Sequence, residues 1–139
     1  MLTAPLWMKE ATAITMSTDA SFKKISATDW SSKLNALGEI VEGYDDIKQC
    51  IEIILLTSKG SVPHRPEFGC DIFKYLDLPA NHAVPRLIYE AHEALKRWEP
   101  RIDVESVTAE AKEAHHYLLI ITWRPKAEYE QQVIQEVIL

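Results

Sequence analysis

Residues 58–71 have the sequence SKGSVPHRPEFGCD and separate two segments with helical periodicity. Pro63 and Pro66 bias the residues before them toward extended backbone, so this stretch is expected to form a loop. Gly69 permits a turn with positive φ, which a β-carbon would strain. A companion stretch, WEPRI at residues 98–102, ends the second helical segment at its proline. Each stretch places a proline beside an arginine and a glutamate, so two charged bends are expected to organise the fold.

Two helices are predicted, one on either side of the first bend. Asp45 and Asp46 open the first helix, where carboxylates suit the positive end of the helix dipole. The second helix begins between Asn81 and Pro85, and Pro100 ends it. Each helix has one apolar face at the spacing i, i+3, i+4 and i+7. The two faces comprise Ile47, Cys50, Ile51, Ile54 and Leu55, and then Val84, Leu87, Ile88, Ala91, Ala94, Leu95 and Trp98.

After the second bend the pattern changes from helical to alternating. Ile102 and Val104 alternate with polar residues, and residues 117–123 are apolar on both faces, which is typical of a central strand. Residues 110–114 are predicted to connect these two strands. The tail, residues 129–139, fits a helix or a strand, and its Val-Ile pairs favour a third strand. The predicted fold is therefore α+β, with helices packed on one face of a small C-terminal antiparallel or mixed sheet whose edge is uncovered.

The N-terminal part of the chain is less regular. Residues 1–28 show little periodicity and are predicted to form an arm that is extended or bound to a partner. Residues 29–139 are predicted to form a single α+β domain. Within it, Asp29 and Gly38 bracket a short apolar pattern that predicts a helix with an aspartate cap. Residues 39–42 are predicted to form a short strand.

Composition narrows the class of function. The formal net charge is -6 and the pI is about 5.3, which argues against binding to the nucleic-acid backbone. Cys50 and Cys70 are too few for a disulfide scaffold and fit a reducing cytoplasm. No aliphatic run approaches the ~20 residues that span a bilayer, and no signal peptide is evident. We therefore expect an intracellular domain with neither nucleic-acid nor membrane partners.

The residue types that bind metals and cofactors do not form a recognisable pattern. The five histidines and two cysteines lack the short spacing of zinc ligands, and His115 and His116 would point to opposite faces of a strand. None of the four glycines lies in a G-x-G pattern, so no phosphate-binding loop is predicted. We expect no metal and no cofactor.

The two bends contribute four charged side chains that have two interpretations. Arg65 and Glu67 come from the first bend, and Glu99 and Arg101 come from the second. In the structural interpretation, the guanidinium groups bind the carboxylates and brace the loop against the end of the long helix. In the catalytic interpretation, the two glutamates are the acid and base of a glycosidase. Adjacent arginines lower the pKa of a carboxyl, which is the wrong direction for the acid, so the brace is favoured and no catalytic residue is predicted.

Residues 57–81, TSKGSVPHRPEFGCDIFKYLDLPAN, together with the WEPRI stretch, resemble the baseplate-wedge or sheath-initiator family of contractile phage tails. Older naming calls its members tail lysozymes, and relatives occur in type VI secretion baseplates. The family combines a helix ending in Thr, a G-x-x-x-x-R-P-x-F-G loop and a later E-P-R-I motif before the strands. The matching residues are Gly60, Arg65, Pro66, Glu67, Phe68, Gly69, Glu99, Pro100, Arg101 and Ile102. The resemblance covers roughly residues 38–124.

This resemblance implies a structural part of a virion rather than an enzyme. Family members lie in the tail baseplate next to the tail tube, in several copies arranged as a ring, and are assembled in the cytoplasm of the host bacterium. The implied partners are other baseplate wedge proteins, the tail sheath protein, and the tail tube or hub. The first sheath subunits assemble on C-terminal strands, which correspond here to strands that contain Trp123, Val133 and Val137.

Two other functions stay open at the level of the sequence. A peptidoglycan hydrolase, in line with the older family name, would need Glu67 or Glu99 in an open cleft. A small regulatory anti-adaptor is the second alternative, because such a protein resembles the same family and one fold can carry different sites.

Overall fold

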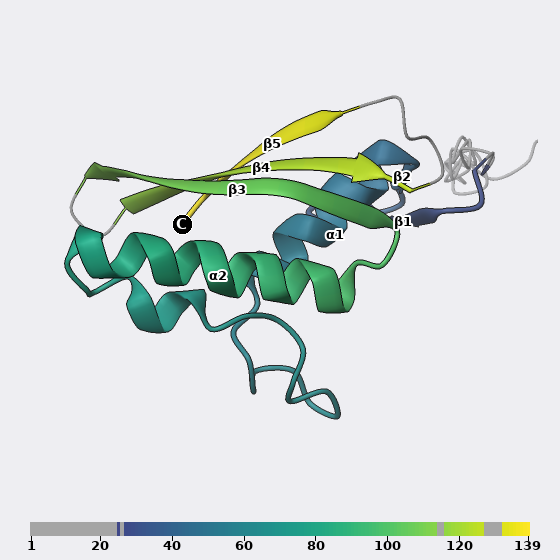
Figure 1. Cartoon of the computed structure of the whole chain (residues 1–139). Helices are drawn as coiled ribbons and strands as arrows, with labels where there is room; N and C mark the ends of the chain where they lie inside the picture. The colour runs from purple at the N-terminus through teal and green to yellow at the C-terminus, as the bar shows by residue number, and fades with distance from the viewer. Residues whose placement is uncertain (1–24, 26, 114–115, 127–131) are drawn as a thin grey trace, which may run out of the picture.

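The structure is a computed structural model that describes residues 25, 27–113, 116–126 and 132–139. In Figure 1, α2 lies beneath a C-terminal sheet, α1 lies behind the strands, and a small hairpin precedes both helices. The elements are β1 (Trp30–Ser32), β2 (Ile40–Glu42), α1 (Tyr44–Leu56), the 3-10 helix η2 (Ile72–Tyr75), α2 (Ala80–Trp98), β3 (Ile102–Glu113), β4 (His116–Pro125) and β5 (Val133–Ile138). No helix in these ranges is long and apolar enough to cross a membrane.

The C-terminal sheet is antiparallel, in the order β3-β4-β5. β3 pairs with β4 along its whole length, with two shifts of register that are typical of β-bulges. β5 pairs with β4 from Leu118↔Ile138 to Trp123↔Val133. The predicted α+β class, the central strand and the third strand in the tail are therefore confirmed.

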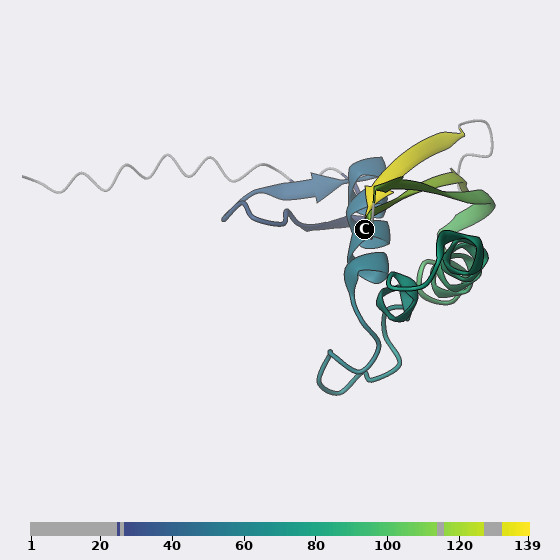
Figure 2. The same ribbon diagram turned by 90° about the vertical axis from the view of Figure 1, so that its left-hand side faces the viewer.

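Both helices cover the same face of the sheet. Figure 1 shows α2 running beneath β3, and Figure 2 shows α2 end-on below the strands with α1 beside it. Successive residues of a strand point to opposite faces. The residues of β4 that face the helices are Tyr117, Leu119, Ile121 and Trp123, and all four are buried. They pack against the predicted helix faces, from which Ile51, Leu55, Leu87 and Leu95 are fully buried.

The segment before α1 forms a hairpin, so the helix predicted there is wrong. β1 pairs with β2, and Figure 2 shows this hairpin projecting from the body of the molecule. The side chain of Gln49 on α1 anchors it: the amide nitrogen donates to the Ser32 carbonyl (2.8 Å), and the amide oxygen accepts from the Leu34 N–H (2.9 Å). These tertiary hydrogen bonds override a weak helical pattern. The strand predicted at residues 39–42 is confirmed as β2.

Three smaller predictions have different outcomes. The connection predicted at residues 110–114 is wrong over most of its length, because β3 continues to Glu113 and stays paired with β4 as far as His116. α2 begins at Ala80, one residue before the predicted range of Asn81 to Pro85, so Pro85 lies in its second turn. The predicted arm, residues 1–28, lies almost wholly outside the described residues and stays a prediction.

Candidate functional site

The second bend places Arg101 at the centre of an ion-pair cluster. Its Nε lies 2.7 Å from Glu99 Oε1, and its Nη2 donates to Glu99 Oε2 at 2.9 Å, which is a bidentate pair. Its Nη1 donates to Asp46 Oδ2 at 2.8 Å and lies 3.6 Å from Asp29 Oδ1. The hydrogen bonds to Glu99 are the largest cause of the raised pKa of Arg101, against an opposing effect of burial. The guanidinium is therefore permanently charged, and all three of its nitrogens donate hydrogen bonds.

This cluster joins elements that are far apart in the sequence. Glu99 is the residue that follows α2, Asp46 lies in the first turn of α1, and Asp29 precedes β1. Glu99 is 4% exposed and Asp46 is 2% exposed, so both carboxylates lie in a poorly hydrated site, and among the described residues the cation that pairs with them is Arg101. Cys50 Sγ also accepts a hydrogen bond from Arg101 at 3.4 Å, and burial raises the pKa of this thiol. Cys50 was predicted on the core-facing side of α1, but it is only partly buried and borders the ion-pair cluster.

The first bend is a loop fixed by its own backbone. The Cys70 N–H donates to the Thr57 carbonyl at 2.9 Å, and the Gly60 N–H donates to the Pro66 carbonyl at 2.8 Å. Gly69 has φ +96°, and a β-carbon there would lie 2.1 Å from the Thr57 carbonyl oxygen. Only glycine fits this contact, so the turn predicted at Gly69 is confirmed with a steric reason beyond its φ angle.

Ion pairs hold the end of this loop on α2. Lys59 Nζ lies 3.4 Å from Glu90 Oε2 and 3.5 Å from Asp71 Oδ2, and Lys74 Nζ lies 2.9 Å from Asp71 Oδ1. The hydrogen bond from Lys74 is the main cause of the lowered pKa of Asp71. Burial lowers the pKa of Lys59, but the two carboxylates outweigh it and raise that pKa overall. Ion pairs therefore add to the backbone hydrogen bonds that hold the two ends of the loop together.

The buried thiol of Cys70, at the end of this loop, should make the stability of the protein depend on pH. Its thiol is buried and donates to the Leu55 carbonyl at 3.1 Å, and burial raises its pKa from 9.0 to about 11. A raised pKa contributes stability that is present below pH 9 and lost as the pH rises to about 11. Between these pH values the unfolding free energy of the unmodified chain should fall by about 2 kcal/mol more than that of the Cys70→Ala variant, which lacks the thiol. Urea unfolding of both proteins at pH 8 and pH 10.5 measures it, and equal pH dependence would show that the thiol is not enclosed.

The four charges of the bends fall into two separate groups, which corrects the prediction of one cross-link. Glu67 forms its ion pair with Arg97 near the end of α2, so the loop is linked to the helix, but on the exposed surface. Arg65 is exposed and forms no ion pair with any residue that the structure describes. Glu99 and Arg101 pair with each other instead. The second bend therefore satisfies its own charges, whereas Glu67 of the first bend pairs with α2 and not with Arg65, and residue spacing alone does not reveal this difference.

Several members of these groups were not predicted. Asp46 was expected only to suit the helix dipole, whereas it also binds Arg101. Its place in the first turn of an amphipathic helix gave no sign of this second role. Asp29 was expected as a helix cap, and no role was predicted for Arg97. Their partners are set by tertiary packing, so no signal in the sequence identifies them.

The geometry does not support Glu67 and Glu99 as a catalytic pair. Glu67 lies on the exposed loop beside Arg97, whereas both oxygens of the buried Glu99 are bound by Arg101. A hollow of about 370 Å³ at the loop is lined by Glu67 but not by Glu99. Within the described residues, no three His, Cys, Asp or Glu side chains form a group that could hold a metal ion. The brace therefore fits the observed contacts better than acid and base catalysis.

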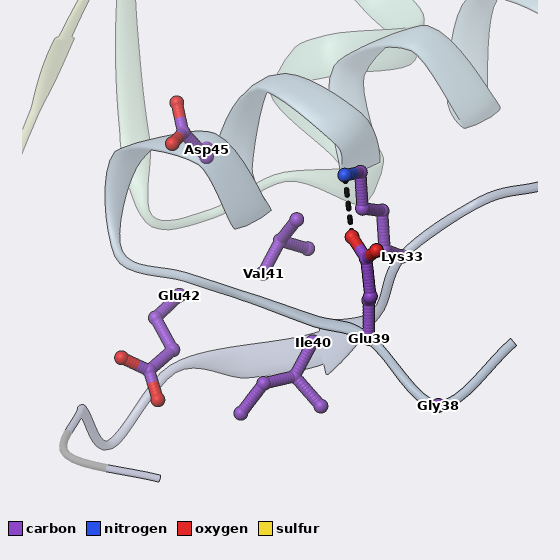
Figure 3. Close-up of a pocket in the computed structure, with 7 residues that line it drawn as sticks. All are labelled: Lys33, Gly38, Glu39, Ile40, Val41, Glu42 and Asp45. Carbon is purple, nitrogen blue, oxygen red and sulfur yellow. Dashed lines mark hydrogen bonds and ion pairs between the residues drawn. The ribbon is translucent and has the colours of Figure 1, made fainter. Parts of the chain in front are cut away.

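The hairpin and the first turn of α1 enclose a second surface hollow, of about 680 Å³ (Figure 3). Lys33 Nζ lies 2.6 Å from Glu39 Oε2, and Figure 3 shows this pair joined across one side. Asp45 lies on the opposite wall, at the start of α1. The lining is mainly charged side chains and strand backbone, without a cluster of groups typical of catalysis.

β5 forms one free edge of the sheet. Within the described residues it pairs only with β4. The side chains of Trp123 and Val137 are buried and that of Val133 is partly buried, all three facing the helices. The exposed side chains of β5 are instead those of Ile134, Glu136 and Ile138. Any contact of the predicted docking strands with a partner therefore uses backbone and outer-face side chains.

Comparison with known proteins identifies the family. The family described as baseplate wedge protein gp25 matches residues 41–124, well over half of the chain. The chain belongs to the baseplate wedge protein gp25 family. The matched region of this wedge-family chain runs from β2 to β4 and includes both bends. The suspected family is therefore confirmed, and with it a structural role in a baseplate.

Solved structures agree with this assignment. A protein of Geobacter sulfurreducens, whose name as a tail lysozyme is provisional, is 34% identical, with a TM-score of 0.63, 68% of this chain covered and 87% of that one. A chain of the postcontracted pyocin R2 baseplate is 27% identical, with a TM-score of 0.59 over 70% of this chain and 99% of that one. A chain of a type VI secretion baseplate, 19% identical with a TM-score of 0.53 over 67% and 90%, shares the fold. A comparison with curated proteins found no match.

Proposed function

We propose that this chain is a non-catalytic subunit of a contractile tail baseplate and that the free edge of β5 receives a strand of the tail sheath protein. The observation that carries this proposal is the position of β5 at the edge of the sheet, one face of which is covered by the helices. An edge strand offers unpaired N–H and C=O groups along its length. Addition of an extended segment to such an edge is a standard mode of protein recognition.

The register shows which backbone groups are available. The N–H groups of Tyr117 and Leu139 each donate to the carbonyl of the other residue, at 3.3 Å and 2.9 Å. Hydrogen-bonded pairs alternate along antiparallel strands, so Val137, Gln135 and Val133 also bond to β4. The N–H and C=O groups of the residues between them point away from the sheet. These residues are Ile134, Glu136 and Ile138.

Apart from the single exposed charge of Glu136, the edge lacks the features that usually prevent association. β5 has no proline and no lysine, and its side chains at Ile134 and Ile138 are 66% and 75% exposed. The face toward the helices is fixed, because Gln135 Nε2 donates to the Lys48 carbonyl of α1 at 3.0 Å. The strand is thus held on one side and open on the other, as a docking strand requires.

In this proposal the Arg101 cluster holds α1, α2 and the start of β3 in a constant relation, so that the sheet presents its edge in one position. The subunit would occur in several copies around the tail tube of a virion assembled in bacterial cytoplasm, beside other wedge proteins and the tube or hub. The support for this arrangement is membership of the wedge family and likeness to a pyocin baseplate chain. Neither the hydrolase nor the regulatory alternative is favoured by a specific contact.

Glu136→Pro tests the docking edge. Proline removes the N–H that points away from β4 and leaves the bonds between β4 and β5, so an incoming strand loses a partner while the domain stays folded. We expect at least a roughly tenfold drop in sheathed tails, with normal incorporation of the chain into baseplates. Electron microscopy counts the tails, and thermal unfolding checks the fold.

Glu136→Ala is the matched control, because it removes the same side chain and keeps the N–H. It should assemble sheath normally. Normal sheath in the proline variant would contradict docking at this edge, and loss of sheath in both variants would show that the carboxylate matters rather than the backbone.

A further inference from the structure

The loop of the first bend forms a surface that sheath docking does not use. Its hollow of about 370 Å³ is lined by His64, Arg65, Pro66, Glu67, Phe68 and Trp98. The rings of Phe68 and Trp98 meet edge to face, with centroids 5.3 Å apart. An aromatic wall beside an exposed arginine is the composition that carries most of the binding energy in protein interfaces.

The hollow is already formed without a partner. The backbone bonds at Gly60 and Cys70 and the close contact of Gly69 with Thr57 fix the loop. His64 has φ +66°, a left-handed conformation that a residue with a β-carbon adopts at a cost and keeps only where its surroundings impose it. Little ordering is therefore needed for binding, which favours affinity.

The charges around the hollow indicate what it binds. Glu67 is neutralised by Arg97, whose guanidinium also lies 4.9 Å from the ring centroid of Trp98. Arg65 has no ionic partner among the described residues, although the whole chain has a net charge of -6. A carboxylate from another protein can bind this guanidinium through two parallel hydrogen bonds, and an apolar side chain can fill the aromatic hollow.

We propose that the loop hollow binds an extended segment of a neighbouring baseplate subunit, in which an Asp or Glu adjoins an aromatic or branched aliphatic residue. This inference rests on the proposed function, because it takes the chain to be a baseplate subunit. Figures 1 and 2 both place the loop at the end of the molecule opposite the sheet. The loop and the edge of β5 can therefore be occupied at the same time by different partners.

Charge reversal at Arg65 tests the proposal in cells that assemble the tail. Arg65→Glu repels the proposed carboxylate, and we expect the amount of this chain in purified baseplates to fall at least about tenfold. Lys96→Glu is the matched control, because it makes the same change of charge at an exposed position of α2 outside the hollow. It should incorporate normally, and both variants should unfold at the temperature of the unmodified chain. Normal incorporation of Arg65→Glu would overturn the proposal.

A photo-crosslinking amino acid at His64 identifies the occupant in the same particles. The expected product joins this chain to a peptide of a different baseplate protein that contains an acidic residue next to an apolar one. A product with a second copy of this chain, with a peptide lacking an acid, or no product would each overturn the proposal. This test is independent of β5, because the Glu136→Pro variant should still form the cross-link even if it assembles no sheath. If the Glu136→Pro variant formed both the cross-link and a normal sheath, only the proposal of docking at β5 would be contradicted.

Discussion

Arg101→Leu is expected to lower the free energy of unfolding by about 3–5 kcal/mol, because it leaves two buried carboxylates without a counter-charge. Glu99 is 4% exposed and Asp46 is 2% exposed, and both bind the lost guanidinium directly. A domain of this size is stabilised by only about 5–15 kcal/mol in total, so this loss is large. Urea unfolding followed by circular dichroism at neutral pH measures it.

Arg124→Leu is the matched control for this experiment. Arg124 Nε lies 2.6 Å from Glu105 Oε1, a similar distance, but both side chains are substantially exposed. Exposed ion pairs contribute about 0–1 kcal/mol, so the control should change stability little. Equal effects of the two substitutions would show that the Arg101 cluster is not the brace between α1 and α2.

Gly69→Ala is the second substitution with a large expected effect. A β-carbon would meet the carbonyl oxygen of Thr57 at 2.1 Å and its carbon at 2.9 Å, and both are backbone atoms that cannot turn aside. The contact adds to the strain of φ +96°. We expect a loss of about 3 kcal/mol or more in unfolding free energy, together with faster hydrogen exchange at the Cys70 N–H.

Gly60→Ala separates the two causes. Gly60 has φ +87°, but nothing lies within 4 Å of the β-carbon that alanine would add. Only the conformational strain applies there, so we expect a loss of about 1 kcal/mol. If the two alanine variants lost the same stability, the close approach of the loop to Thr57 would not be the reason for glycine at position 69.

The parts of the fold that could be predicted are those set by local periodicity. The apolar faces of both helices, the proline that ends α2 and the alternating strands each depend on residues close in sequence. The strand β2 was predicted, but β1 and its pairing with β2 were not, because backbone groups of Ser32 and Leu34 bond to Gln49, which lies on α1. Strand propensity at residues 29–38 is weak, and a distant hydrogen-bond partner decided the outcome.

The candidate site shows the same limit. The two bends were identified from their proline, arginine and glutamate residues, but the partners of those charges depend on packing. Arg101 binds Asp46 from 55 positions away, and Glu67 binds Arg97 from 30 positions away. Trp123, in one of the predicted docking strands, is buried. A partner can therefore contact only the backbone of the edge and the side chains on the face of the sheet away from the helices. A sequence pattern shows that a strand exists, but not which of its groups the fold leaves unpaired.

The most direct measurement is a map of the assembled tail at a resolution that shows main-chain hydrogen bonds. We expect an extended segment of the sheath protein paired with β5 and bonded to the outward backbone groups of Ile134, Glu136 and Ile138. A map in which this edge faces solvent or another wedge protein, while sheath subunits contact a different surface, would contradict it.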